Sequence, residues 1–460
     1  MIKLTPAEFK KLRLNLGRVL PRKRSPLQKV HITLYRDGGI LRVTNLDEFL
    51  SYSQGIQAGK CQEFCVEADV LKKIQDNLKG KKLVLLSYEA ERLKVTFRAV
   101  DEVCSTLTFP TSSASDVPVN DHGLIELKQA DAGAFCDAYK KCSLAVSRDE
   151  SRLALNGVFY SSVDYALVAT NGRQLIVADL KLPVERDILL PTAKSLQCSL
   201  FSGTTKMGTD GEVLVIESAE YRYSLCLKRE KYPDYRQVIP NGLKGSVCIA
   251  QESLAALLQE LCSLLTKSES ISLCFLNQQL FVAVQSDVGI TTRKVEASFN
   301  GEAPEMISVN IQFLREAVSI CDEDVKISFN GEFDPIIIAS TKVKTILMPM
   351  RGAEKELIFK RLNQQTEDTE VKEDVKKDEV TVAEKVDPLK EIFAIVECLE
   401  RQHKDAREKA DLAVRAVKEC QGLTKALTRQ IKLYERDVSS RLKGVKHAED
   451  LVAKLQKLVA

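Results

Sequence analysis

Side chains suited to nucleophilic, acid–base or metal chemistry are scattered in this chain. It has thirteen cysteines and four histidines among 460 residues. Cys61 and Cys65 are the closest cysteines, and neither a C-x-x-C pair nor a histidine cluster occurs. This spacing indicates reduced cysteines buried as small apolar residues rather than disulfides, a zinc site or a histidine-based active site. The GTDGE string at 208–212 is typical of a hairpin turn rather than a phosphate loop. We therefore expect no catalytic residue, metal or cofactor.

Composition and charge limit the class of protein. Hydrophobic residues make up 44% of the chain, and no apolar run approaches the roughly 20 residues that a membrane span needs. The first residues, MIKLTPAEFKKL, alternate charged with apolar side chains, which disfavours a signal peptide. A cytoplasmic protein is expected. Because the net charge is only +3, affinity for nucleic acid would depend on where lysines and arginines lie.

The elements that must position functional side chains repeat six times. A short apolar strand runs into an amphipathic helix near residues 1, 60, 123, 187, 245 and 305. Several strand-like runs separated by turn signals follow, as in VHITLYRDGGILRVTN with its Asp-Gly-Gly turn. One strand, one helix and about three further strands per unit predict an α+β protein. Its antiparallel sheets must close or pair at their edges.

Length and repeat together predict three domains of two units each. The expected boundaries are 1–121, 122–244 and 245–351. The segment TSSASDVPVNDHG (111–123) is rich in Ser, Asp and Pro, as expected of a linker, and NGLKG (241–245) marks the next boundary.

The composition changes after Arg351. Residues 352–388 are predicted to form an acidic linker, because the part from 363 is rich in acids and lysines and has no aromatic residue or glycine. Residues 389–460 lack proline and carry a 3,4 spacing of mostly apolar residues, which predicts a helical coiled-coil extension. A straight helix would be on the order of 100 Å long. Gly422 or Gly444 would instead allow an antiparallel hairpin.

Four strings occur in order on this repeat: LALNGVFY (153–160), LVATNGRQLIVADL (167–180), YPDYRQVIP (232–240) and TILMPMR (345–351). Together they resemble the bacterial sliding clamp family, the beta subunit of DNA polymerase III. The resemblance covers residues 1–351. It implies three tandem clamp (processivity-fold) domains and two chains joined head to tail in a dimeric ring. Helices would line a hole that holds duplex DNA without base contacts.

The resemblance also implies that basic side chains on the inner helices and nearby loops face DNA. Mild attraction to phosphates is enough, since tight contacts would stop sliding. Lys194 is assigned to a fourth helix, and Arg18 and Arg315 are further inner-surface charges. The predicted DNA-facing residues are Lys10, Lys11, Arg13, Arg22, Lys23, Arg24, Lys72, Lys73, Lys140, Lys141, Arg148 and Lys194.

A second implied site is an apolar pocket between domains 2 and 3 that receives short peptide motifs from polymerases and other clients. Its walls would suit an extended peptide with one or two large apolar anchors, and soft methionines would accept varied clients. Methionine and proline at a strand terminus favour a pocket over an ordinary sheet core. The predicted walls are Leu155, Thr170, Gly172, Arg173, Leu175, Pro233, Val238, Asn310, Phe313, Phe333, Pro335, Ile346, Leu347, Met348, Pro349, Met350 and Arg351.

Two departures from the family pattern stand out. Gln174 and Gln237 replace basic residues at predicted rim positions, which leaves peptide selectivity open. In addition, residues 352–460 follow the point where the usual clamp ends, beside the predicted pocket. This extension is expected either to recruit a partner through its coiled coil or to fold back and regulate the pocket.

The leading hypothesis is a non-enzymatic DNA sliding clamp in the bacterial cytoplasm, associated with the nucleoid. Its expected partners are double-stranded DNA, the replicative polymerase, the clamp loader, a second copy of itself and an unknown coiled-coil partner, with no membrane. The alternative is a clamp-like paralogue that acts as an oligomeric scaffold through its coiled coil and is not loaded on DNA. An enzyme is a distant third.

Overall fold

A computed structural model describes residues 1–21, 25–99, 103–119, 125–198, 201, 203–264, 270–286, 289–351 and 355–363. These residues belong to one compact unit, Met1–Thr366. None of its described helices is both long and apolar enough to cross a membrane. The predicted coiled coil at 389–460 and the predicted linker beyond residue 363 lie outside the described residues.

The first two units follow the predicted order of strand, helix and three strands. Unit 1 comprises β1 (Ile2–Leu4), α1 (Pro6–Val19), β2 (Lys29–Tyr35), β3 (Gly38–Thr44) and β4 (Glu48–Gly55). Unit 2 comprises β5 (Gln62–Glu67), α2 (Asp69–Asp76), β6 (Leu83–Glu89), β7 (Arg92–Arg98) and β8 (Val103–Pro110).

Units 3 and 4 repeat the order, apart from one helix. Unit 3 comprises β9 (Lys128–Ala130), α3 (Ala132–Cys142), β10 (Gly157–Ser161), β11 (Ala166–Thr170) and β12 (Gln174–Asp179). Unit 4 comprises β13 (Ile188–Pro191), β14 (Thr205–Thr209), β15 (Val213–Glu217) and β16 (Tyr221–Cys226).

The last two units complete the repeat, with one added strand. Unit 5 comprises β17 (Gly245–Ile249), α4 (Gln251–Leu264), β18 (Ser270–Leu276), β19 (Gln279–Ser286), β20 (Gly289–Val295) and the extra β21 (Ser298–Gly301). Unit 6 comprises β22 (Met306–Asn310), α5 (Ile311–Ser319), β23 (Val325–Phe329), β24 (Ile336–Ala339) and β25 (Val343–Leu347).

Local signals explain how α1 begins. Thr5 is its N-cap, and the Thr5 side chain accepts a hydrogen bond from the Glu8 backbone N–H at 3.3 Å. The Glu8 carboxylate in turn accepts one from the Thr5 N–H at 2.8 Å. Pro6 occupies the first helical position, where a missing N–H costs nothing. The helix can therefore bury its apolar face and leave Lys10 and Lys11 exposed.

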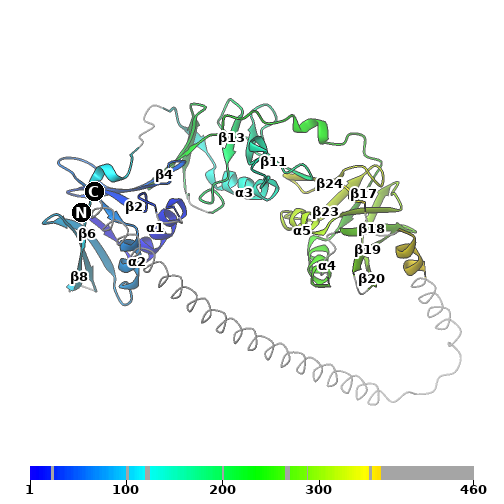
Figure 1. The fold of residues 1–460 in the computed structure, drawn as a ribbon, viewed down its shortest axis with the longest axis horizontal. Helices are drawn as coiled ribbons and strands as arrows, with labels where there is room; N and C mark the ends of the chain where they lie inside the picture. Colours follow the sequence, from blue (N-terminus) through cyan, green and yellow to red (C-terminus); the bar gives the residue numbers. More distant parts are fainter. Residues whose placement is uncertain are drawn as a thin grey trace, which may run out of the picture. The chain divides into compact units, whose positions relative to one another are not determined.

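The strands form four antiparallel sheets (Figure 1). Their orders are β1-β6-β7-β8, β5-β2-β3-β4-β16-β15-β14-β9, β13-β10-β11-β12-β25-β24-β23-β17-β21 and β20-β19-β18-β22. The helices pack against them in pairs: α1 contacts α2, β3 and β4, and α4 contacts α5.

The longer sheets join units that are three apart in the sequence. The last strand of unit 1 pairs with the last strand of unit 4, through β4 and β16. Likewise the last strand of unit 3 pairs with that of unit 6, through β12 and β25. The corresponding strands of units 2 and 5 are β8 and β20, the fourth strand of each unit, and each stands at the end of a four-stranded sheet.

The predicted fourth helix is not formed among the described residues. After β13 the chain makes turns at 194–197 instead, with the Gln197 N–H donating to the Lys194 carbonyl at 3.3 Å. The physical reason lies in the neighbouring Ser195, whose side chain is buried in hydrogen bonds to residues of other strands. Those bonds hold the segment in the turn. Lys194 therefore sits on a turn and not on a helix.

A helix at 355–363 was not predicted. It falls inside the expected acidic linker, yet Ile358 and Leu362 are fully buried. They pack with Cys274, Phe281 and Met306 on the β20-β19-β18-β22 sheet. The linker prediction is wrong here because residues 355–362 still carry an apolar face, which the sheet covers.

Cysteine burial follows the prediction in part. Cys65, Cys136 and Cys142 are buried like small apolar residues, as are Cys274 and Cys321. Burial raises the pKa of the Cys142 thiol to about 12, so this thiol is inert at neutral pH. Among the cysteines whose burial the structure describes, Cys61 and Cys248 are exposed.

Candidate functional sites

A cationic groove of about 570 Å³ lies between α1, α2 and the 194–197 turn. Arg13, Arg18, Lys72 and Lys194 line it, against one acid, Asp69. Since the groove carries an excess of positive charge, it can attract phosphate groups without reading bases.

Hydrogen bonds position the arginines of this cationic groove. The Arg13 guanidinium donates to the Gln75 side-chain oxygen at 2.8 Å, which ties α1 to α2. The Arg18 guanidinium donates to the Asn15 side-chain oxygen at 2.9 Å. Both side chains are half-buried. Their charge is therefore held on the groove wall rather than on a freely moving side chain.

A buried carboxylate holds the turn that carries Lys194. Glu48 on β4 is only 7% exposed and accepts hydrogen bonds from the Ser195 and Tyr223 hydroxyls. The Asn45 side-chain amide donates to it at 3.1 Å. Burial and the Glu48 charge raise the pKa of Tyr223 well above its ordinary value, so this hydroxyl keeps its proton. The network connects β4 of unit 1 with the turn and β16 of unit 4.

An apolar cluster occupies one face of the nine-stranded sheet. The outer cluster, as we call it, contains Leu175 on β12 and Ile346 on β25, which are direct cross-strand partners. Phe159 stacks on Tyr232 with ring centroids 4.7 Å apart. Leu155 is a half-buried member at its margin. The cluster thus joins two units of the repeat to the 232–239 segment.

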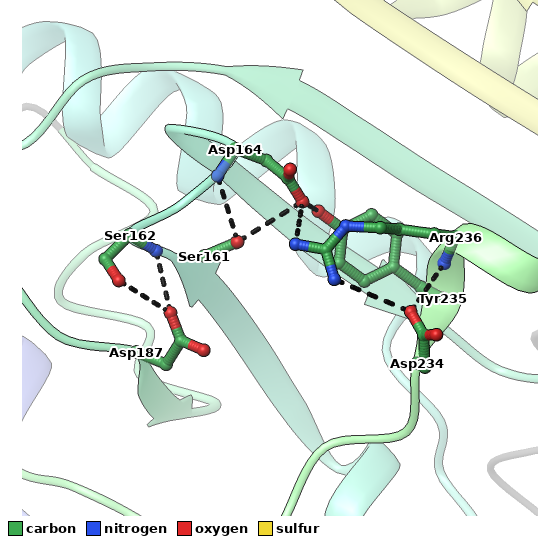
Figure 2. A network of polar contacts seen from close by, with 7 residues as sticks. All are labelled: Ser161, Ser162, Asp164, Asp187, Asp234, Tyr235 and Arg236. Atoms are coloured by element: carbon green, nitrogen blue, oxygen red, sulfur yellow. Dashed lines mark hydrogen bonds and ion pairs between the residues drawn. The ribbon is translucent and has the colours of Figure 1, made fainter.

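Polar contacts anchor this 232–239 segment to the β10–β11 turn (Figure 2). The Asp164 carboxylate accepts a hydrogen bond from the Tyr235 hydroxyl and forms an ion pair with Arg236 at 2.6 Å. Asp234 caps the short 3-10 helix Tyr235–Val238. Partial burial acts to raise the pKa of Asp164, but Tyr235 and Arg236 outweigh it and hold the pKa below its ordinary value. The segment is fixed by a charged network rather than by sheet pairing.

Exposed apolar side chains lie around the outer cluster. Val238 is 46% exposed and Met348 is 41% exposed, whereas Leu175 in the cluster is 3% exposed. The Met348 N–H donates to the Arg173 carbonyl at 3.0 Å, which joins the end of β25 to the β11–β12 turn. Gly172 in that turn has a positive φ of 86°. The arrangement places exposed apolar side chains beside backbone hydrogen-bonding groups. An extended peptide needs both, for its large side chains and for its main chain.

Comparisons with known proteins match this architecture. The family model "DNA polymerase III beta subunit, C-terminal domain" matches residues 236–351. The beta sliding clamp of Borreliella burgdorferi is 27% identical over 224 residues, 45% of this chain and 56% of that protein. That of Rickettsia bellii is 21% identical over 351 residues, 70% of this chain and 91% of that protein. The chain is therefore similar to beta sliding clamps along most of its described part.

Solved structures of sliding clamps share the fold. The Thermotoga maritima beta subunit aligns with a TM-score of 0.67 at 21% identity, covering 76% of this chain and 99% of that one. The Bartonella birtlesii sliding clamp, solved bound to griselimycin, aligns with a TM-score of 0.66 at 19% identity, covering 76% and 99%. The chain spans only about half the length of the first curated clamps that it matches, 56% in two of them.

The predicted DNA-facing residues divide into four groups. Arg13, Lys72 and Lys194 meet in the cationic groove. Lys141 instead pairs with Asp322 at 2.7 Å and is 23% exposed. Arg22, Lys23 and Arg24 lie outside the described residues. The remaining predicted residues are exposed: Lys10, Lys11, Lys73, Lys140 and Arg148, with Arg315 on α5.

Part of the predicted clamp pocket comes together in the outer cluster. Leu155, Leu175 and Ile346 are members, and Met348 joins the turn at Arg173. Thr170 ends β11, Gly172 lies in the turn that follows, Pro233 and Val238 lie in the anchored segment, and Pro349, Met350 and Arg351 follow β25.

Other predicted pocket residues have different surroundings. Asn310 is 7% exposed and caps α5 by accepting hydrogen bonds from two backbone N–H groups. Leu347 and the half-buried Phe313 belong to the core beneath α5, because successive strand residues face opposite sides of a sheet. Phe333 is 69% exposed in the loop before Pro335. The predicted wall residues are therefore divided between the two faces of this sheet and a neighbouring loop.

Two further positions differ from expectation. Gln174, placed on the rim from sequence, is 2% exposed and donates to Glu316 on α5 at 3.3 Å. It is the first residue of β12, so strand pairing buries it. Arg152 was not predicted, yet its guanidinium lies 3.2 Å from where a Cβ on Gly172 would be. Its position directly before the LALNG string was the available signal.

Proposed function

We propose that this chain is a DNA sliding clamp, a non-enzymatic ring that encircles duplex DNA and tethers the replicative polymerase. The pairing of units three apart carries the proposal. Units 1 and 4 share one sheet and units 3 and 6 share another. If units three apart always pair, unit 5 of one copy would pair with unit 2 of the next copy. Head-to-tail pairing of β20 with the partner's β8 would then close a ring. Such pairing is favourable because an edge strand has unpaired backbone N–H and C=O groups.

The repeat also supports three domains, at 1–121, 122–244 and 245–351. Two such chains would give a six-domain homodimer. Inside it, the cationic groove and the exposed lysines of α1, α2 and α3 would attract phosphates weakly. The place of action would be the bacterial cytoplasm, at the nucleoid, because DNA and the clamp loader are found there.

The surface around the outer cluster is the proposed client site. Leu175 and Ile346 would form its floor, Val238 and Met348 its exposed walls, and the exposed Phe333 loop a further part of its border. Extended peptides of the polymerase and the clamp loader would bind through one or two large apolar side chains. We call it the peptide-binding surface. The coiled-coil extension would recruit a further partner.

The similar proteins are named as clamps, which does not favour the scaffold alternative. Two measurements on the full chain test the proposal. Light scattering should give the mass of a dimer. Chain bound to a circular plasmid should be retained through gel filtration and lost after one restriction cut.

A bulky protein fixed at both ends of the cut DNA is the control, and it should restore retention. A monomeric chain, or equal retention on circular and cut DNA, would reject the clamp and leave the scaffold as the better hypothesis.

A further inference from the structure

The helix at 355–363 begins four residues after the proposed peptide-binding surface ends at Arg351. In Figure 1 it is the dark yellow helix beside β18 and β19. Ile358 and Leu362 anchor it, because both are fully buried against the β20-β19-β18-β22 sheet. The anchor keeps the first residue of the helix, Lys355, in place.

Lys355 joins two segments of the chain. Its ammonium group pairs with Glu305 at 2.8 Å and with Glu332 at 3.1 Å. These ion pairs, Glu305 first and then Glu332, raise the pKa of Lys355, so it stays charged. The Lys355 side chain is 37% exposed and that of Glu332 is 28% exposed. A shared, partly buried ion pair restrains its partners better than a fully exposed one.

Glu332 borders a predicted pocket residue, and Glu305 borders a strand that bonds the 348–351 segment. Glu332 directly precedes Phe333 in the loop that leads to Pro335. Glu305 directly precedes β22, and its carbonyl accepts a hydrogen bond from the Phe275 N–H at 2.9 Å. Strand β22 in turn accepts the Met350 N–H, through the Ser308 carbonyl, at 2.8 Å. The segment 348–351 is therefore restrained on both sides: by Arg173 and Ser308 before the helix, and by Lys355 after it.

We propose that Lys355 is a positioning residue for the peptide-binding surface. Through Glu332 it holds the Phe333 loop, and through the helix it holds the 348–351 segment, so that both are preorganised for the client. The inference rests on the proposed function. It assigns a role in client binding to a residue beyond the segment that resembles the clamp family, which ends at residue 351.

Preorganisation predicts that loss of the Lys355 ion pairs lowers the affinity for the client peptide. If the surface is free to move, its apparent affinity falls by the fraction of time spent in the competent arrangement. We expect Lys355→Gln to weaken binding about fivefold on that basis. Lys355→Arg keeps both ion pairs and should stay within about twofold. Lys360→Gln is the matched control, because Lys360 is exposed on the same helix and the charge change is identical.

The test uses the full chain and a fluorescein-labelled pentapeptide that carries leucine and phenylalanine side chains, followed by anisotropy at 25 °C. Hydrogen exchange of 330–335 and 348–351 is measured on the same variants. Faster exchange at both segments in Lys355→Gln, but not in Lys360→Gln, would separate positioning from a loss of overall stability. Glu332→Gln should reproduce the affinity loss, and the double variant should add little to it.

The two possible failures are distinguishable. If the unaltered chain binds the peptide and Lys355→Gln binds it equally well, the positioning role is overturned and the client site stands. If the unaltered chain does not bind the peptide, the client site itself fails and the positioning role fails with it.

Discussion

The backbone N–H of Met348 donates to the carbonyl oxygen of Arg173 at 3.0 Å. This single bond joins the end of β25 to the β11–β12 turn, although the two residues lie in different units of the repeat. Together with the β12–β25 ladder, this bond sets the spacing between two walls of the proposed peptide-binding surface. Side chains projecting from either wall can then contact one extended ligand.

Met348→Ala should weaken binding of the labelled pentapeptide about tenfold, which corresponds to about 1.4 kcal/mol. The substitution removes a side chain that is 41% exposed and leaves the backbone bond to Arg173 in place. Fluorescence anisotropy measures the effect. Val163→Ala is the control, since Val163 is 73% exposed in the β10–β11 turn. Equal affinities of the Met348 and Val163 variants would contradict the site.

Lys72→Gln combined with Lys194→Gln should reduce the salt dependence of binding to a 30-base-pair duplex. The two lysines come from different elements but line one cationic groove. The slope of log affinity against log salt falls by about 0.9 for each phosphate that the protein no longer neutralises. Anisotropy titrations at several salt concentrations give the slope. Lys342→Gln, an exposed residue between β24 and β25, should leave it unchanged. An unaltered slope in the double variant would exclude the groove from DNA binding.

Tyr223→Phe should lower the free energy of unfolding by about 1–3 kcal/mol. The variant leaves the buried Glu48 carboxylate with one hydrogen-bond donor fewer. Urea denaturation at neutral pH measures the change. Tyr88→Phe also removes a phenolic hydroxyl, but the Tyr88 ring stacks on Phe64 and its hydroxyl has no bond among the described residues. The Tyr88 variant is expected to stay within about 0.5 kcal/mol. Similar losses of stability in both variants would argue against a special role of Glu48.

Asp164→Asn should destabilise the protein at pH 7, and the difference from the unaltered chain should vanish in acid. The pKa of Asp164 in the folded state is held below its ordinary value of 3.8. Its ionised form therefore stabilises the fold above that pH, and this contribution is lost as the pH falls through the folded-state pKa. Urea denaturation at pH 7, at pH 5 and at a third pH below the folded-state pKa follows the effect. A difference that is the same at all three pH values would show that Asp164 acts without its charge (Figure 2).

The repeat and the order of elements could be predicted because they depend on local patterns. All six units begin with the expected strand, from β1 to β22. Alternation and helical spacing report which side chains are buried, and this information is contained in short windows of sequence. The fourth helix was the exception, because Ser195 is held by Glu48 and Tyr223, which are distant in the sequence. A local pattern carries no sign of such partners.

The candidate sites were predicted less evenly. Residues in the four family strings, such as Leu155, Leu175 and Ile346, do lie together. Gln174 was predicted on the pocket rim, but its side chain is buried. The exposure of this side chain depends on the pairing of β12 with β25, which are far apart in the sequence. Arg152 was missed for the same kind of reason, since its nearness to Gly172 arises from the fold of two loops.

The sequence by itself determined the six-unit repeat and the order of most elements within each unit, since both depend on residue types at fixed spacing. Only the tertiary structure decided which units share a sheet, which basic side chains meet in one groove, and that residues 355–363 pack on the β20-β19-β18-β22 sheet. Pairing between distant segments depends on the apolar surface that the whole chain buries when it folds. No single stretch of sequence contains that information.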